Sequence, residues 1–334
     1  MEILEKIREK ARALHKTVVL PESGDERVLK AAQMAVDEHI ASVILLGDED
    51  TVRKRAQSLN VDLSRVVVVN PLTDPKREHY VESMYALRRS KGLTREQAEE
   101  VLRENTMYYA CMMLYHGDVD GVVGGAVLTT PDVIRPALQI IKTAPGIKLA
   151  SSCFLMVFPD CPYGENGVFL YADCGLNPNP NAEELAHIAV TTARTWRSLI
   201  GTEPKVAMLS FSTKGSAKHE LVDKVIQATE TARSLDPKLL LDGELQGDAA
   251  LVPQVAQKKS PGSQVAGRAN VLIFPDLNAG NICYKLTERL GKGSAIGPIL
   301  QGVAKPVNDL SRGCKAEDIR DQIAVTVLQS QVLS

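Results

Sequence analysis

Short apolar runs alternate with stretches of helical spacing from the start of the chain, and this alternation constrains the fold more than any other feature. Strands are predicted at residues 17–20, 42–46 and 66–69. Amphipathic helices are predicted at 2–15, 25–38 and from 48 to about 59. Because the strands are continuously apolar, they are typical of a parallel sheet that helices cover on both faces.

The same pattern continues through the rest of the chain. Further helices are predicted at 76–90, 94–116, 181–199, 219–235 and 279–290. Further strands are predicted at 149–158, 168–172, 206–211, 239–241 and 271–274. The sequence thus predicts an α/β protein with mostly parallel sheets.

Two domains are expected, since 334 residues exceed the roughly 250–300 at which single cores stop growing. Breaks in the pattern fall at Ala144-Pro145-Gly146 and at Gly297-Pro298. We predict a discontinuous first α/β domain, residues 1–145 plus 300–334, and an inserted second domain, residues 146–299. Ligands are then expected in the interdomain cleft, at the carboxyl ends of strands.

Composition excludes several classes of partner. The 39 basic and 41 acidic residues balance, and aromatic residues are few, so we expect no nucleic-acid partner. No apolar run reaches the roughly 20 residues that span a bilayer, so no membrane partner is expected either. The six cysteines form no CxxC pair and the six histidines no HxxxH pair. We therefore expect a cytoplasmic protein with reduced thiols and no metal site.

The polar loop 308–313, which lies between a short apolar run and a predicted helix, is the first candidate site. Ile319, Ile323 and Val327 define the buried face of that helix. The loop and the first helical turn bring Ser311, Arg312 and Asp318 to one junction, where free backbone N–H groups suit anions. Local turn bonds and compensation of the helix dipole are the structural alternative.

Three other stretches could bind phosphate. Residues 120–126 form a glycine-bearing strand end, which Thr130 and Pro131 follow at a helix start and Arg135 one turn later. The spacing matches neither GxGxxG nor a P-loop. The cluster 88–92 reads more readily as a basic helix end capped by glycine. The loop 212–218 is equally compatible with a phosphate site and a solvated turn.

Four stretches are specific enough to indicate a family. They are Val206–Ala217, Asp242–Gln246, Pro275–Asn281 and Asn308–Cys314. With them the chain resembles the short, single-module phosphate acetyltransferases along nearly its whole length. The resemblance implies two α/β domains around a cleft, as in isocitrate and isopropylmalate dehydrogenases, and an acyltransferase that moves acetyl groups between coenzyme A and inorganic phosphate. It also implies a homodimer, no cofactor (coenzyme A being a substrate), and acetate kinase as the neighbour in acetate metabolism.

The resemblance also assigns residues. It implies Ser311, Arg312 and Asp318 as catalytic, Arg88 and Arg135 as ligands of coenzyme A, and Cys161 as near the site but not essential. The hydroxyls of Thr129 and Thr130 stand where relatives often carry a run of serines, and they would face phosphate.

The chemistry suggests how these groups act. Asp318 would accept the thiol proton, Arg312 would bind the acetyl-phosphate oxygens and Ser311 would donate to the developing oxyanion. An ordinary aspartate, with a pKa near 3.9, is a poor base for a thiol with a pKa near 8.5, so the role needs a desolvated Asp318 or a thiolate stabilised by Arg312.

Alternatives remain open at this point. A covalent route through Cys161 or Cys314 would give ping-pong kinetics. Phosphate butyryltransferase is the nearest rival in substrate, and a metal-dependent dehydrogenase or a regulatory module are rivals in function.

Overall fold

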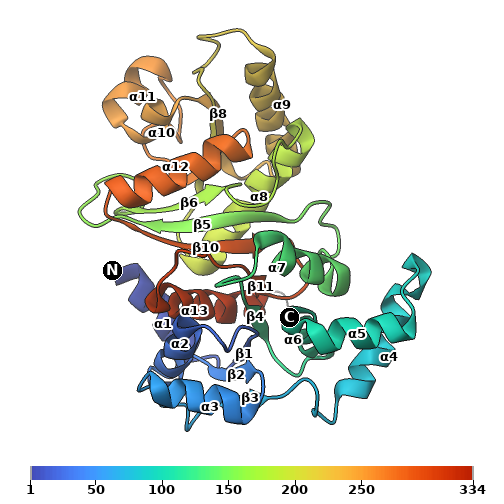
Figure 1. Ribbon diagram of the computed structural model, residues 1–334. Coiled ribbons are helices and arrows are strands. Elements are labelled where there is room, and N and C mark those ends of the chain that lie inside the picture. Colours follow the sequence, from blue (N-terminus) through green and yellow to red (C-terminus); the bar gives the residue numbers. More distant parts are fainter. Residues whose placement is uncertain (1, 333–334) are drawn as a thin grey trace. The chain divides into compact units, whose positions relative to one another are not determined.

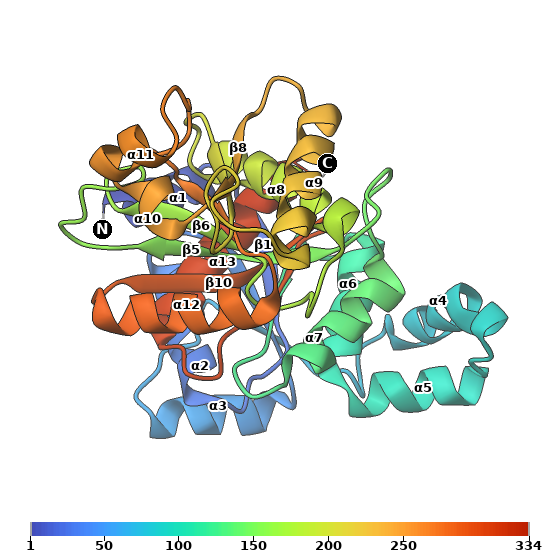
Figure 2. The same cartoon turned by 90° about the horizontal axis from the view of Figure 1, so that it is seen from above.

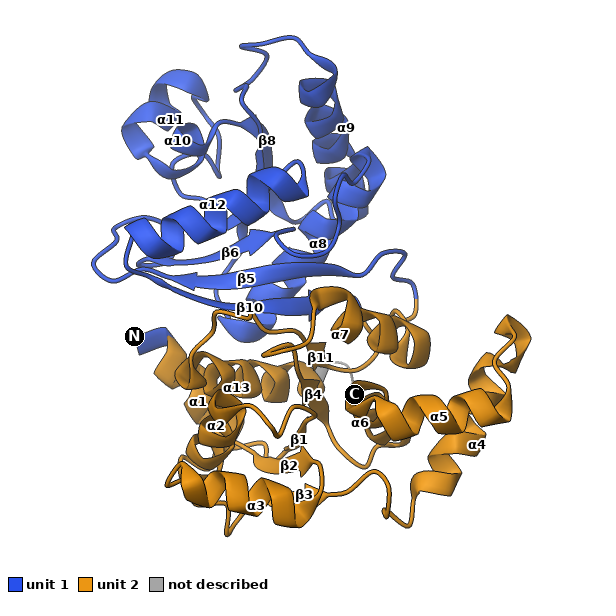
Figure 3. Cartoon of the chain, viewed as in Figure 1, with its two compact units in different colours: residues 1–3, 146–302 blue, residues 4–145, 303–334 orange. Residues whose placement is uncertain are grey.

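The computed structural model describes residues 2–332, which divide into two compact units. Unit 1 comprises residues 146–302 together with the first residues of the chain, and unit 2 comprises Leu4–Pro145 and the chain from Val303 onward. Figure 3 colours the two units separately. Among the described residues, every helix is too short or too polar to span a bilayer.

Unit 2 contains a five-stranded sheet in the order β11-β4-β1-β2-β3, with all neighbours parallel. The strands are β1 Thr17–Leu20, β2 Ser42–Leu46, β3 Val67–Val69, β4 Gly121–Val123 and β11 Val307–Asn308. Val18 lies opposite Val43 on one side and Gly121 on the other. The parallel sheet predicted from the apolar runs is therefore confirmed.

Helices pack on this sheet and on one another, and two of them, Arg77–Arg88 and Arg95–Glu104, project away from it (Figure 1). The helices are α1 Glu2–Arg12, α2 Glu26–Asp37, α3 Glu49–Ser58, α4 Arg77–Arg88, α5 Arg95–Glu104, α6 Thr106–His116, α7 Thr130–Pro136 and α13 Ala316–Val332. Short turns of other helix types, Arg89–Lys91 and Ala137–Ile141, follow α4 and α7. The last helix, α13, packs on α2 and β4. The predicted face Ile319, Ile323 and Val327 is fully buried, which confirms that prediction.

The single helix predicted at 94–116 was wrong, because the chain forms two helices there. Asn105 ends α5 and caps α6, its side chain accepting the Met107 N–H at 3.0 Å. Thr94 caps α5 with a reciprocal bond to Gln97. Apolar spacing continues across Asn105, so periodicity alone did not reveal the break.

Unit 1 contains a six-stranded sheet in the order β10-β5-β6-β9-β7-β8. The strands are β5 Ser151–Val157, β6 Val168–Ala172, β7 Lys205–Leu209, β8 Leu240–Leu245, β9 Val271–Ile273 and β10 Ser294–Gln301. The β10–β5 and β5–β6 pairs are antiparallel, and the other three pairs are parallel. Gly297 and Pro298 lie inside β10, where the register shifts.

The helices of unit 1 are α8 Ala182–Leu199, α9 Glu220–Leu235, α10 Gly247–Leu251, α11 Pro253–Lys259 and α12 Leu277–Leu290. Helices α8 and α9 pack side by side (Figure 2). Trp196 on α8 is fully buried, and Phe154 stacks on Tyr284 with ring centroids 4.0 Å apart. These aromatic side chains help to fill the core around the sheet.

Candidate active site

Three loops meet at one edge of the unit 2 sheet. They follow β1 (residues 21–25), β4 (residues 124–129) and β11 (residues 309–315). Because β1, β4 and β11 are parallel neighbours, their carboxyl ends lie at the same edge. The predicted residues Thr129, Thr130, Ser311 and Arg312 lie on or beside these loops.

Arg27, in the first turn of α2, makes hydrogen bonds to all three loops. Its guanidinium donates to the backbone oxygens of Ala126 at 2.7 Å, Arg312 at 2.7 Å and Cys314 at 3.1 Å. It also forms a two-point ion pair with Asp25, at 2.8 and 3.0 Å. The planar fork of arginine suits several fixed acceptors at once, so Arg27 fixes the backbone that carries Arg312.

Glu22 fixes the loop after β4. Its carboxylate accepts four consecutive backbone N–H groups, those of Gly125, Ala126, Val127 and Leu128, at 2.7–2.8 Å. This glycine-bearing loop was predicted to be a phosphate cradle. Its amides are instead bonded to a carboxylate of the same chain.

Asp309, directly after β11, is fully buried between two of the loops. The Thr130 hydroxyl donates to its Oδ2 at 2.7 Å, and within residues 2–332 its Oδ1 has no hydrogen-bond partner. Burial raises the pKa of Asp309 to about 7, with the Glu22 charge adding to the rise and the Thr130 bond opposing it. The carboxyl group therefore holds its proton to a much higher pH than an ordinary aspartate does.

The three predicted catalytic residues lie on the β11–α13 segment. Ser311 is half-buried and accepts a long bond from the Gly313 N–H at 3.4 Å. Arg312 is exposed, and its guanidinium makes no hydrogen bond or ion pair within the described part of the chain, although its charge lowers the pKa of the nearby Asp309. Asp318, in the first turn of α13, accepts the Lys315 N–H at 2.8 Å. Burial raises the pKa of Asp318 and outweighs the lowering effect of that bond.

Arg88 and Arg135 lie on other helices of unit 2. Arg88 ends α4 and, with Lys91, Tyr108 and other residues, lines a hollow of about 500 Å³. Arg135 is exposed on α7. Burial raises the pKa of Tyr108 while the charges of Arg135 and Arg88 both oppose that rise, so both arginines lie within electrostatic reach of one hydroxyl.

The two predicted threonine hydroxyls already have acceptors. Thr129 donates to Asp132 at 2.5 Å, and Thr130 donates to Asp309. A phosphate could accept a hydrogen bond from either hydroxyl only by displacing the carboxylate that accepts it now.

The two candidate cysteines differ in place. Cys161 is half-buried in the β5–β6 loop of unit 1. Cys314 is half-buried in unit 2, where burial raises the pKa of its thiol to about 11. A thiol with that pKa is a poor nucleophile at neutral pH.

The loop 212–218 uses its polar groups within unit 1. Glu244, which is buried, accepts Ser212 Oγ at 2.9 Å and the Gly215 N–H at 2.7 Å. Lys214 donates to Asp242 at 2.5 Å. Hydrogen bonds therefore join two of the stretches that indicate the family, Val206–Ala217 and Asp242–Gln246. The strand predicted at 239–241 was too short, since β8 runs from Leu240 to Leu245.

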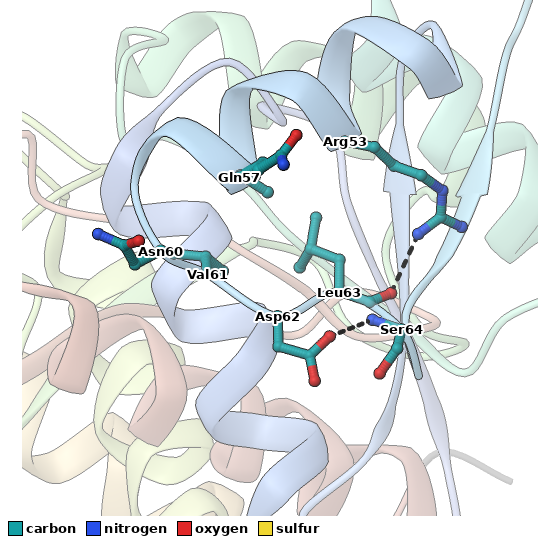
Figure 4. Close-up of a pocket in the computed structure, with 8 residues that line it drawn as sticks. Arg53, Gln57, Asn60, Val61, Asp62, Leu63 and Ser64 are labelled. Carbon is teal, nitrogen blue, oxygen red and sulfur yellow. Dashed lines mark hydrogen bonds between the residues drawn. The ribbon is translucent and has the colours of Figure 1, made fainter.

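A further hollow of about 570 Å³ lies between the end of α3 and the chain leading to β3 (Figure 4). Arg53 donates to the Leu63 carbonyl there at 3.2 Å, and the Ser64 N–H donates to Asp62 at 2.8 Å. Because this chain segment leads into the amino end of β3, the hollow belongs to the sheet edge opposite the three loops. Within residues 2–332, no group of three or more histidine, cysteine or acidic side chains could bind a metal ion.

Sequence reasoning missed Glu22, Arg27 and Asp309. Each is a single charged residue within a few positions of the carboxyl end of a strand, and the partners through which it joins two loops lie about 100 to 285 positions away in the sequence. The local signal was no more than a charged residue near the end of a strand.

Comparisons with known proteins agree over the whole chain. Residues 2–327 match the family model described as phosphate acetyl/butaryl transferase. A phosphate acetyltransferase of Thermoanaerobacterium thermosaccharolyticum is 56% identical over 99% of this chain and 100% of its own length. The crystal structure of a phosphotransacetylase from Streptococcus pyogenes is 45% identical, covers 99% of this chain and 98% of its own, and gives a TM-score of 0.92.

A structure from Salmonella typhimurium, described as a 4-hydroxythreonine-4-phosphate dehydrogenase, shows the relation of the fold to dehydrogenases. It covers 94% of this chain and 99% of its own, at 11% identity and a TM-score of 0.55. That likeness concerns the fold alone. By the family model and its whole-length relatives, the chain belongs to the phosphate acetyl/butaryl transferase family.

Proposed function

We propose that this chain is a phosphate acetyltransferase, which reversibly transfers an acetyl group between acetyl-coenzyme A and inorganic phosphate. The observation that carries the proposal is the geometry of the β11–α13 loop. An exposed guanidinium without a hydrogen bond or ion pair in residues 2–332, Arg312, shares that loop with Ser311 and precedes a carboxylate of raised pKa, Asp318. Relatives that match the whole chain bear the same name as the proposed activity.

The roles follow from the chemistry of each group. Arg312 would bind the phosphate oxygens in a bidentate manner, and Ser311 would donate to the carbonyl oxygen as it becomes an oxyanion. Asp318 would accept the thiol proton of coenzyme A. Because the pKa of Asp318 is raised, it lies closer to the pKa of a thiol than the pKa of an ordinary aspartate does. The thiolate would then attack the acetyl carbon directly, in a ternary complex.

Coenzyme A carries phosphates at its nucleotide end, and these need cations. The hollow beside Arg88 and Lys91, with Arg135 on the neighbouring α7, supports a site for that end. We propose that Thr129 and Thr130 border the bound phosphate, and that Cys161 of unit 1 lies near the site without being essential. Coenzyme A is a substrate, and the reaction needs no cofactor.

We propose that the protein is a cytoplasmic homodimer that acts in acetate metabolism beside acetate kinase. Support for the dimer comes from α12, on which Ile282, Leu286 and Leu290 are more than half exposed. Their spacing of four places them on one helix face, and an apolar stripe of this kind is typical of a subunit interface.

Leu286→Glu tests the dimer. It should shift the sedimenting species from dimer to monomer, because a carboxylate in an apolar interface is costly. Arg103→Glu, at an exposed position of α5 in unit 2, changes the charge by two units and serves as the control. A dimer that survives Leu286→Glu would contradict an interface at α12.

The activity test follows thioester formation from acetyl phosphate and coenzyme A. Wild type is run beside Arg312→Ala and beside Arg103→Ala, which removes an exposed arginine whose one side-chain bond within residues 2–332 is to Glu104. Activity that is lost in Arg312→Ala, is kept in Arg103→Ala and falls with butyryl phosphate is the expected result. Equal turnover of butyryl phosphate would shift the assignment to a butyryltransferase, and no thioester from any short acyl phosphate would refute the proposal.

A further inference from the structure

The loop after β4 has the form of an anion site. Its four amides at Gly125, Ala126, Val127 and Leu128 converge on one point, and Gly125 has a positive φ of 107°. Successive N–H groups arranged in this way form a concave anion site, which we call the amide nest. The anion in the amide nest is the carboxylate of Glu22, with two amides on each oxygen.

Filling the amide nest from within has two physical consequences. Four N–H groups obtain a charged acceptor, and each such bond is stronger than a bond between neutral groups. A substrate phosphate is meanwhile excluded, because it would have to displace one anion with another. Arg312 is an exposed cation on the neighbouring β11–α13 loop, and within residues 2–332 its guanidinium makes no hydrogen bond or ion pair.

The position of the amide nest also sets the position of the β11–α13 loop. The Ala126 carbonyl accepts from Arg27, and Arg27 donates in turn to the Arg312 carbonyl. A Cβ atom on Gly125 would lie 2.0 Å from Asp309 Oδ1, so the two loops touch there without spare room. A shift of the amide nest would therefore move the backbone on which Ser311 and Arg312 stand.

We propose that Glu22 is a positioning residue. Its carboxylate fills the amide nest, keeps substrate phosphate out of it and fixes the loop that sets the place of Arg312. Glu22 itself touches neither the substrate nor the reacting atoms. The inference rests on the proposed function of Arg312, whereas the filling of the amide nest is a property of the fold.

Three variants test separately whether Glu22 positions the β11–α13 loop and whether its carboxylate fills the amide nest. They are Glu22→Ala, Glu22→Gln and a control, Glu26→Ala. Glu26 lies four residues further on, and its carboxylate pairs with Lys30. For Glu22→Ala we expect kcat to fall by about 10- to 100-fold, the range that a displacement of roughly 1 Å can cause, with little change in the KM for coenzyme A. Glu26→Ala should match wild type.

Sodium formate is the probe for the emptied amide nest. It should restore part of the kcat of Glu22→Ala and raise its thermal midpoint, relative to sodium chloride at the same ionic strength. Wild type and Glu26→Ala should show no such difference. Glu22→Gln, whose side chain still fills the space, should lose activity without rescue.

Unchanged kcat in Glu22→Ala would overturn the positioning role. A loss of kcat with no response of rate or midpoint to formate would overturn the filling of the amide nest by an anion. If Glu22→Ala does not fold, the kcat of Glu22→Gln is the test. A wild-type kcat in Glu22→Gln would refute the need for a carboxylate. Wild type without thioester formation would refute the proposed function instead, while the formate-dependent midpoint would still test the amide nest.

Discussion

Replacing Asp309 by asparagine tests whether folding raises the pKa of the carboxyl group directly after β11. Asp309 is fully buried, and only one of its oxygens has a partner in the described residues. Asparagine has nearly the same shape, and its amide oxygen can accept the Thr130 hydroxyl. The substitution therefore removes the buried charge and leaves the packing nearly unchanged.

The pKa of Asp309 gives the expected magnitude. It rises from 3.8 to about 7 on folding, so the folded state binds the proton more tightly than the unfolded state. Stability contributed by aspartate is thus lost as the pH rises between these values. At about 1.4 kcal/mol per unit, the cost is about 1.5 kcal/mol at pH 5 and about 4 kcal/mol at pH 8. The free energy of unfolding of Asp309→Asn, relative to wild type, should increase by about 2.5 kcal/mol between pH 5 and pH 8.

Urea unfolding followed by circular dichroism, at pH 5 and pH 8, measures this difference. Tryptophan fluorescence is unsuitable, because the one tryptophan, Trp196, lies in unit 1 and Asp309 lies in unit 2. Asp48→Asn is the matched control. Asp48 is exposed and caps α3, and its bonds to Thr51 lower its pKa, so asparagine there should give the same difference at both pH values.

A pH-independent difference for Asp309→Asn would refute the reasoning, because any packing cost of the amide is the same at both pH values and cancels. So would greater destabilisation at pH 8 than at pH 5, which would mean that the ionised carboxylate stabilises the fold.

Substitutions at three other positions test the site. Asp318→Asn should lower kcat by about 100-fold or more, and Asp318→Glu by less, since a general base contributes on that scale; near-normal turnover by the asparagine variant would exclude the base role. Cys314→Ala should keep near-wild-type turnover, and wild type should give intersecting double-reciprocal plots, because burial raises the pKa of that thiol to about 11; parallel lines would favour a covalent route. Gly125→Ala should destabilise the fold by about 1–3 kcal/mol, since its φ is 107° and its Cβ would meet Asp309; an unchanged thermal midpoint would contradict the close contact.

The sequence predicted local structure well where one signal dominated. Uninterrupted apolar runs predicted the strands at 17–20, 42–46 and 168–172 with the bounds observed. The strand prediction failed where polar side chains inside a strand form hydrogen bonds with residues distant in the sequence. Asp242 and Glu244 lie inside β8 because Lys214, Arg233 and Ser212 bond their carboxylates. No local rule supplies those distant partners.

In the candidate site too, local sequence signals identified some features, and contacts between distant residues determined the others. Hydroxyl, guanidinium and carboxylate groups beside a strand end identified Ser311, Arg312 and Asp318 as candidates. The hydrogen bonds between the loops could not be predicted from the sequence, because they depend on which strands become neighbours in the sheet. Glu22 and Gly125 are 103 residues apart and meet only because β1 pairs with β4. The same carboxylate turned a glycine-rich loop, predicted to bind phosphate, into one whose amides are already bonded.

The discontinuity of unit 2 bears on the order in which the chain acquires its structure during synthesis. Residues 4–145 leave the ribosome first, but β11 and α13, which complete their sheet and pack on α2 and β4, leave last. At about 5–20 residues per second, the surface that α13 covers waits roughly 10–40 s while some 190 further residues are made. Unit 1, almost entirely one continuous stretch, can finish in that interval. The half of the protein begun first is therefore completed second, and its unfinished apolar surface is what a nascent-chain chaperone would meet.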